Sequence, residues 1–176
     1  TNILDKGYSS YIADSGFCND RSLSSGDGVS LDSLTIYSGW DRLTNSNPSL
    51  ICPNITNDLF TLSNNTIGNK ALTYPIGLIT ADEIYFAGSG KNGYMYSGEW
   101  FWTMTPFGSD YSPDHYTNFF GNFYGSIAAY SDDYPSTSVV SLRPVINLKA
   151  NTIINKKVLK EINKFGKMRE LMLYIK

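Results

Sequence analysis

Hydrophobic and polar positions follow a regular pattern over only a few short stretches of this chain. Thr80 and Glu83 match a capping box, in which the threonine hydroxyl accepts from the Glu83 N–H and the Glu83 carboxylate accepts from the Thr80 N–H. A short helix is therefore expected to begin near Ala81 and to end by Gly88. The apolar run 74–79, directly before the capping box, is expected to enter the core.

Three segments have the composition of β-strands. Residues 59–62 form a brief apolar stretch, and residues 98–104 are rich in the aromatic and β-branched types that suit a half-buried sheet surface. Pro106 is expected to end the second strand. Residues 139–148 predict a third strand, in which Pro144 requires an edge position, a bulge or a strand start.

Long polar segments separate these elements. Residues 19–34 are mostly turn formers and acids, which predicts a long ordered loop, and residues 8–15 show a spacing that fits the end of a helix. Asp20, Asp27 and Asp32 have the side chains to ligate calcium, but their spacing does not match an EF-hand loop. A solvated loop without a metal is the favoured interpretation.

The pattern becomes helical from residue 153 onward, where apolar side chains recur opposite lysines and predict a basic amphipathic helix. Residues 151–176 hold seven basic and two acidic residues, a net charge of +5, whereas residues 1–150 hold seven basic and fourteen acidic residues, a net charge of −7. The tail is expected to dock on its own acidic body, on a partner or on an anionic membrane, in that order. So acidic a body gives no reason to expect nucleic-acid binding.

Length and composition favour one domain over residues 1–150, followed by the tail. The 176 residues are 41% hydrophobic, and the charged share of 17% is low, so neutral polar groups must keep the surface hydrated. That balance suits an extracellular protein. No run approaches the roughly 18 apolar residues of a membrane span, so any export signal or membrane anchor would lie upstream of this sequence.

Cys18 and Cys52 are the only cysteines, and their spacing fits neither a redox C-x-x-C motif nor a zinc knuckle. A disulfide is the favoured interpretation, and it would stabilise the fold by roughly 3–4 kcal/mol. Two buried free thiols in a cytosolic protein remain the alternative.

Residues 110–134 combine eight Phe and Tyr residues with several Asp and Asn residues. Tyrosine offers a large amphipathic contact area with few rotatable bonds, and Asn and Asp add adaptable hydrogen bonds, as in antibody paratopes. We expect Phe mainly in the core and Tyr, Asp and Asn mainly outside. The candidate ligand-binding residues are Tyr111, Asp114, His115, Tyr116, Asn118, Asn122, Tyr124, Tyr130, Asp132, Asp133 and Tyr134.

A hydrolase is the competing interpretation of the same segment. His115 is the single histidine and lies near Asp110 and Asp114, which is the pairing that a general base requires. The chain has no G-x-S-x-G nucleophile motif. We therefore predict no catalytic residue, and a solvated histidine is favoured.

Five parts of the chain, taken in order, resemble a family of uncharacterised bacterial surface proteins, many of them from gut Firmicutes. These parts are residues 17–22, 52–53 with 57–61, 74–83, 98–103 and 142–148, and the resemblance runs from about residue 8 to 150. The family's domain is similar to the C-type-lectin-like fold of formylglycine-generating enzymes. The resemblance implies an α+β domain with small mixed sheets, short helices and long ordered loops, often attached to a pilin-like or other surface anchor.

Within that fold, the resemblance implies that residues 142–148 form the last strand and close the small sheet, and that residues 105–138 supply the ligand-facing surface. Family members usually continue past this strand into a turn and another strand, whereas this chain continues into the basic segment. Formylglycine-generating enzymes use cysteines in the C-terminal part of the domain, and no cysteine follows Cys52. The Glu-Pro-Asn, Gln-Pro-Asp and Trp-Asn-Asp tripeptides of calcium-dependent lectins are also absent, so no metal or cofactor is expected.

Together these patterns predict a non-enzymatic, adhesin-like binding module of a secreted or cell-surface bacterial protein. Its expected partner is a host or bacterial surface protein or a glycan, with no nucleic acid. Membrane contact would come only through an anchor outside this sequence or weakly through the 153–176 helix. The alternative function is a structural subunit or docking module of a pilus or envelope assembly.

Overall fold

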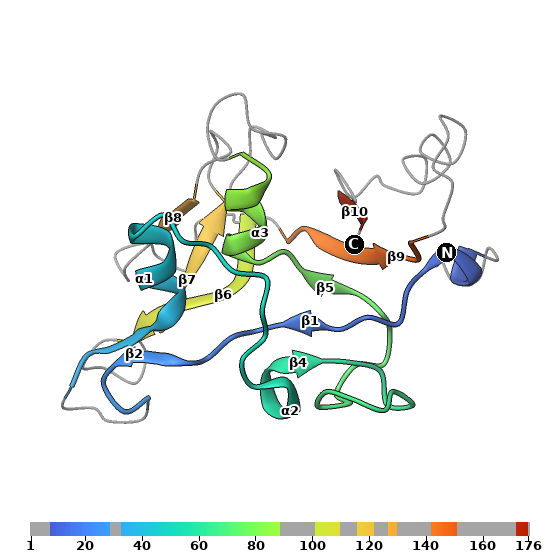
Figure 1. The fold of residues 1–176 in the computed structure, drawn as a ribbon, viewed down its shortest axis with the longest axis horizontal. Coiled ribbons are helices and arrows are strands. Elements are labelled where there is room, and N and C mark those ends of the chain that lie inside the picture. The colour runs from blue at the N-terminus through green and yellow to red at the C-terminus, as the bar shows by residue number, and fades with distance from the viewer. Residues whose placement is uncertain are drawn as a thin grey trace.

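The computed structural model describes residues 8–28, 33–88, 101–109, 116–121, 127–129, 142–150 and 172–175. Within these ranges the chain is an α+β protein with small sheets and a few short helices, joined by long irregular connections (Figure 1). The expected α+β class is confirmed at this level.

One sheet has five antiparallel strands in the order β2-β3-β6-β7-β8. They are β2 (Leu23–Ser25), β3 (Thr35–Tyr37), β6 (Phe101–Ser109), β7 (Tyr116–Gly121) and β8 (Ile127–Ala129). The prediction that Pro106 ends its strand is wrong, because β6 continues through it to Ser109. Its pairing with β7 shifts register on both sides of Pro106, and such irregularities let a sheet accept a residue without an N–H.

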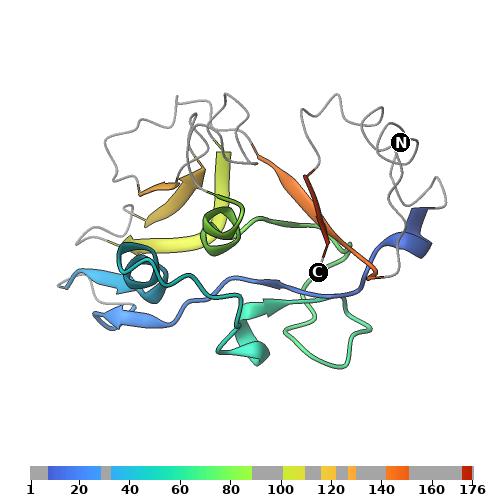
Figure 2. The ribbon, with the colours of Figure 1, turned by 45° about the horizontal axis from the view of Figure 1, so that its top comes forward.

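Two helices pack against this sheet and against each other. α1 (Ser38–Thr44) contacts β2, β3 and β6, and α3 (Ala81–Phe86) contacts β6, β7 and β8, as Figure 2 shows from a second direction. No helix in the described ranges is long and apolar enough to cross a bilayer.

A second sheet has β9 (Pro144–Leu148) in its centre, antiparallel to β5 (Gly77–Leu78) and parallel to β10 (Met172–Ile175). Pro144 is the first residue of β9, which is one of the three positions expected for it. Contrary to the expectation from the resemblance, β9 does not close this sheet, because β10 pairs beyond it.

The C-terminal helix is a wrong prediction for residues 172–175. These residues form β10, whose Leu173 lies opposite Ile146 of β9. Residues 172–175 pair through their backbone with the buried strand β9 instead of forming a helix. Strand pairing, like a helix, supplies partners for backbone N–H and C=O groups. Residues 151–171 lie outside the described ranges, so the helix predicted there is not tested.

A third, two-stranded sheet pairs β1 (Phe17–Cys18) with β4 (Leu59–Phe60), which confirms the brief strand expected at 59–62. The short helix α2 (Ile55–Asp58) precedes β4, and the 3-10 helix η2 (Tyr8–Tyr11) precedes β1. The loop expected over 19–34 is interrupted by β2 and ends at β3.

The core lies where the three sheets and α3 meet. Five buried apolar side chains come from or next to five different elements: Phe17, Ile79, Ile84, Phe101 and Val145. Each is at most 6% exposed. Since the elements are short, this shared cluster joins parts of the chain that are far apart in sequence.

The expected capping box is present at the start of α3. The Glu83 N–H donates to Thr80 Oγ1 at 3.1 Å, and the Thr80 N–H donates to Glu83 Oε2 at 2.9 Å. A third N–H of this helix end, that of Ala81, donates to Thr105 Oγ1 of β6 at 2.9 Å. The cap therefore also fixes α3 to the five-stranded sheet.

Gly77 lets β5 lie directly on the Phe17 ring. A Cβ atom at Gly77 would fall 2.3 Å from Phe17 Cγ, far inside van der Waals contact. Because the ring is buried, a larger residue has no room unless the strands move apart.

We predict that Gly77→Ala lowers the free energy of unfolding by about 1–3 kcal/mol, the usual cost of overpacking a core. Urea denaturation measures it. In a double-mutant cycle with Phe17→Ala, truncation removes the Cγ and Cδ atoms that clash, so the double variant should be more stable than the sum of the two single losses predicts. Strictly additive losses would contradict the contact.

Candidate functional site

The residues expected to bind a ligand lie mostly outside the described ranges. Two of them are described, as backbone positions of β7: Tyr116 lies opposite Ser109, and Asn118 lies opposite Pro106. The others, which include the histidine of the hydrolase alternative, lie outside: Tyr111, Asp114, His115, Asn122, Tyr124, Tyr130, Asp132, Asp133 and Tyr134.

The described strands fix where these segments join the fold. Residues 110–115 connect β6 to β7, and residues 122–126 connect β7 to β8. Since neighbouring strands are antiparallel, the two connections attach at opposite ends of β7. A six-residue strand is about 17 Å long, so the predicted residues enter the fold from two places instead of one.

Arg42 is the centre of a buried ion-pair cluster. Its Nε and Nη2 atoms donate to the two carboxylate oxygens of Asp82, both at 2.9 Å. Its Nη1 atom donates to Asp20 Oδ2 at 2.6 Å. The arginine side chain is 17% exposed, and those of Asp20 and Asp82 are 6% and 4% exposed. One guanidinium thus joins α1 to α3 and to the segment after β1.

The hydrogen bonds that Arg42 donates to Asp82 raise the pKa of Arg42 above its ordinary value, although burial opposes this change. A cation with a raised pKa contributes its stability fully below the pKa of the unfolded chain and loses it only as pH rises through the folded value. The guanidinium therefore remains charged throughout the acidic and neutral range.

The two carboxylates also organise nearby backbone. Asp82 Oδ1 accepts from the Ser49 N–H at 2.9 Å, which holds the segment between α1 and the disulfide against α3. Asp20 Oδ1 accepts from the N–H and the hydroxyl of Ser22, at 3.0 and 2.6 Å. With Arg42 bound as well, both carboxylates have their oxygens occupied by this chain.

These bonds argue against calcium at Asp20. Asp20 points inward to Arg42, whereas Asp27 is exposed and Asp32 lies outside the described residues. In the part of the chain that the structure describes, no three His, Cys, Asp or Glu side chains gather as metal ligands.

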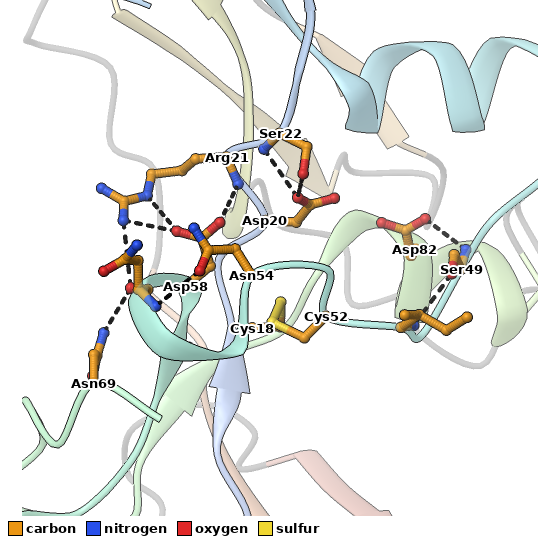
Figure 3. The surroundings of a disulfide bond; sticks show 12 residues. Cys18, Asp20, Arg21, Ser22, Ser49, Cys52, Asn54, Asp58, Asn69 and Asp82 are labelled. Carbon is orange, nitrogen blue, oxygen red and sulfur yellow. Dashed lines mark hydrogen bonds and ion pairs between the residues drawn. A yellow bond between two sulfur atoms is a disulfide. The ribbon is translucent and has the colours of Figure 1, made fainter. Parts of the chain in front are cut away.

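Cys18 and Cys52 form the disulfide that the sequence analysis favoured, with their Cα atoms 5.8 Å apart. The alternative of two free thiols is thereby contradicted. In Figure 3 the disulfide lies between Asn54 and Asp58 on one side and Ser49 and Asp82 on the other. The bridge therefore lies between the Arg42 cluster and the residues around Asp58.

A small cavity of about 30 Å³ lies between the disulfide and the Arg42 cluster, lined among others by Cys18, Arg42, Ser49, Thr80 and Thr105. A water needs about 10–15 Å³ of such space, so this cavity suits one or two waters and is too small for a ligand.

The second ion pair joins Arg21 to Asp58. Arg21 Nε and the Arg21 N–H donate to the two oxygens of Asp58 at 2.8 and 3.1 Å, and Arg21 Nη2 lies 2.7 Å from Asp58 Oδ1 (Figure 3). Asp58 is buried while Arg21 is about half exposed. The pair fixes the segment after β1 to the end of α2.

Beside this pair is an open groove of about 350 Å³, which we call the polar groove. It is lined by Arg21, Ser22, Leu23, Asp27, Gly28, Tyr37, Asn54, Asn57 and Asp58. Sequence analysis missed it because its walls come from three segments that no local pattern connects. Asn54, a favoured N-cap type ahead of α2, was the available local signal.

We predict that Arg42→Met lowers the free energy of unfolding by about 3–5 kcal/mol, because two buried carboxylates lose their cation. Arg42→Lys should lose less, since it keeps the charge but not the fork that binds Asp82 through two nitrogens. Urea denaturation at neutral pH measures both, and equal losses would contradict the role of the fork.

We predict that reducing the disulfide lowers the free energy of unfolding by about 3–4 kcal/mol, as expected for a loop of this length. Urea denaturation with and without dithiothreitol gives the difference. The double variant Cys18→Ser with Cys52→Ser is the control, because its stability should not respond to the reductant.

The comparisons with known proteins add no relative to this description. Neither the protein-family models, nor the curated proteins, nor the solved structures contain a match to this chain. The function must therefore be argued from the residues, their chemistry and the frame that holds them.

Proposed function

We propose that this chain is a non-enzymatic, extracellular binding module of a bacterial surface protein, with a C-type-lectin-like fold and adhesin-like function. Its ligand-binding surface is formed by the aromatic, Asp-rich and Asn-rich residues between 110 and 134. The observation that carries the proposal is the antiparallel β6-β7-β8 arrangement, from which this segment emerges.

The frame supports binding through loops. Function commonly resides in connections that a rigid scaffold positions, and here β6 is held by α3 through Thr105 and by β3 through backbone pairing. Loops attached at both ends of β7 can present one surface across the strand or two surfaces about 17 Å apart.

The disulfide supports an extracellular location. Disulfides form and persist in oxidising compartments and are rare in the cytosol, where thiols are kept reduced. The bridge also compensates for the shortness of the regular elements that surround it, as in many small secreted domains. Both properties suit a protein displayed outside the cell.

The C-type-lectin-like fold is proposed from the resemblance and from the kind of architecture. Small sheets, short helices and long connections in residues 8–150 agree with what that fold implies. The pairing of β10 with β9 agrees with the further strand that family members usually have beyond the strand at 142–148, where the helical spacing of this chain had predicted a helix.

An assembly module is the second candidate, favoured by the position of β10. This strand of four residues pairs along β9, and its far edge has no strand partner among the described residues. Unpaired strand edges are sites where another chain can add a strand. A second copy or a neighbouring subunit would then extend the sheet.

We predict that replacing Tyr111, Tyr116, Tyr124, Tyr130 and Tyr134 by Ala together weakens binding to host mucus by about tenfold or more, because buried tyrosines are typical interface anchors. A pull-down from mucus with a dilution series measures the loss.

The matched control is Tyr74→Ala, since Tyr74 is 51% exposed and lies outside the proposed surface. Unchanged binding by the five-tyrosine variant would contradict the proposed surface. If the wild-type chain instead forms a concentration-dependent oligomer without a ligand, that result favours the assembly module over the adhesin-like module. Deleting residues 153–176 does not separate the two, because it also removes β10.

A further inference from the structure

Among the described residues, the lining of the polar groove includes none from 110–134, the segment proposed to carry the adhesin-like function. Its lining residues come from the segment 21–28, from Tyr37 at the end of β3, and from the segment 54–58 around α2. Its volume of about 350 Å³ is at the lower end of the roughly 300–1,000 Å³ of small-molecule sites. The groove is therefore large enough for a small organic ligand, unlike the cavity beside the disulfide.

The groove walls are held in place by the rest of the fold. The Asn19 N–H donates to the Asp58 carbonyl and the Ser38 N–H donates to the Ser22 carbonyl, both at 2.8 Å. The carbonyl of Asn57 accepts from Asn69 Nδ2 at 3.0 Å. Walls that are fixed before binding reduce the entropy that a ligand must overcome.

The charges in the groove do not favour an anion. Arg21 is already neutralised by Asp58, with Nη2 at 2.7 Å from Oδ1. Asp27 adds a further negative charge to the lining. A phosphate or a carboxylate would have to compete with Asp58 for the guanidinium of Arg21. A neutral ligand therefore fits the groove better than an anionic one.

The uncharged lining offers donors and acceptors. Asn54 Oδ1 accepts from the Asn57 N–H at 3.3 Å, which leaves the Asn54 amide nitrogen for a ligand. The Asn57 side-chain amide and the Tyr37 hydroxyl make no hydrogen bond within the described part of the chain. Two amides and a phenol thus combine donor and acceptor capacity without a formal charge.

The same lining also offers apolar surface. Leu23 of β2 lies opposite Tyr37 of β3 in the sheet register, and the leucine is 42% exposed. The side chain of Tyr37 combines an apolar ring with a polar hydroxyl at its end. Apolar surface beside uncharged hydrogen-bonding groups matches the two kinds of surface on a sugar ring, its C–H face and its hydroxyls.

We propose that the polar groove is a saccharide-binding site that takes a neutral sugar without a metal ion. This site goes beyond the surface proposed at 110–134 and does not depend on it. Tyr37 supplies the apolar platform, and Asn54 and Asn57 supply hydrogen bonds to ring hydroxyls.

The test uses the full chain on immobilised glycans ending in mannose, galactose or N-acetylglucosamine, in the presence of EDTA, with sialylated and sulfated glycans as anionic probes. We expect binding to at least one neutral glycan. Tyr37→Ala should weaken it by about tenfold, and Asn57→Ala by about fivefold. The matched controls are Tyr74→Ala and Asn47→Ala, two exposed residues outside the groove, which should bind as the wild type does.

Each other outcome overturns the proposal: no binding to any neutral glycan, a preference for the anionic probes, loss in EDTA, or equal binding by groove and control variants. If Tyr37→Ala fails to fold by circular dichroism, Tyr37→Phe and Asn57→Ala decide, with Asn57→Ala still about fivefold weaker. Glycan binding that survives the five-tyrosine variant, with mucus binding lost, separates this site from the proposed function.

Discussion

The short elements of this fold depend on the guanidinium of Arg42. Two-residue and three-residue strands bury little apolar area, so the hydrophobic cluster alone does not define how the sheets and helices meet. Arg42 binds Asp82 at the start of α3 and Asp20 after β1, and Asp82 in turn holds Ser49. A buried ion pair is weak support for stability against an apolar replacement, but breaking one is costly. The cluster thus acts mainly by fixing which segments become neighbours.

Local chemistry made part of this fold predictable. The capping box at Thr80 and Glu83 is an interaction across three residues, and it could be identified because both partners stand in one short motif. Pro144 at a strand start follows from its missing N–H. The helix α1 was missed because its N-cap residue, Tyr37, makes no side-chain capping hydrogen bond. The sequence therefore contains no capping motif that marks where this helix begins. The segment ending in β10 was misjudged because helical spacing does not record a strand partner that lies far away in the sequence.

The candidate sites were less predictable for the same reason. Arg42 and Asp82 are 40 residues apart, and Arg21 and Asp58 are 37 residues apart, so no period or motif connects them. Composition did single out residues 110–134, and the strands around them add that they join the fold at two ends of β7. None of the segments that line the polar groove stands out by its residue types. Only the fold brings the Asn54 and Asn57 amides beside Tyr37.

The disulfide has a mechanical consequence under the proposed display of this chain on a cell surface. It joins two cysteines 34 positions apart in the sequence, and their Cα atoms stay 5.8 Å apart. The chain between them includes β2, β3 and α1. A pulling force transmitted along the backbone therefore bypasses this span. At about 3.3–3.6 Å per residue, roughly 110–120 Å of chain cannot be extended. The Arg42 cluster has residues within this shielded length, and so do two of the three wall segments of the polar groove. Part of each would therefore remain connected under tension while the segments outside it stretch.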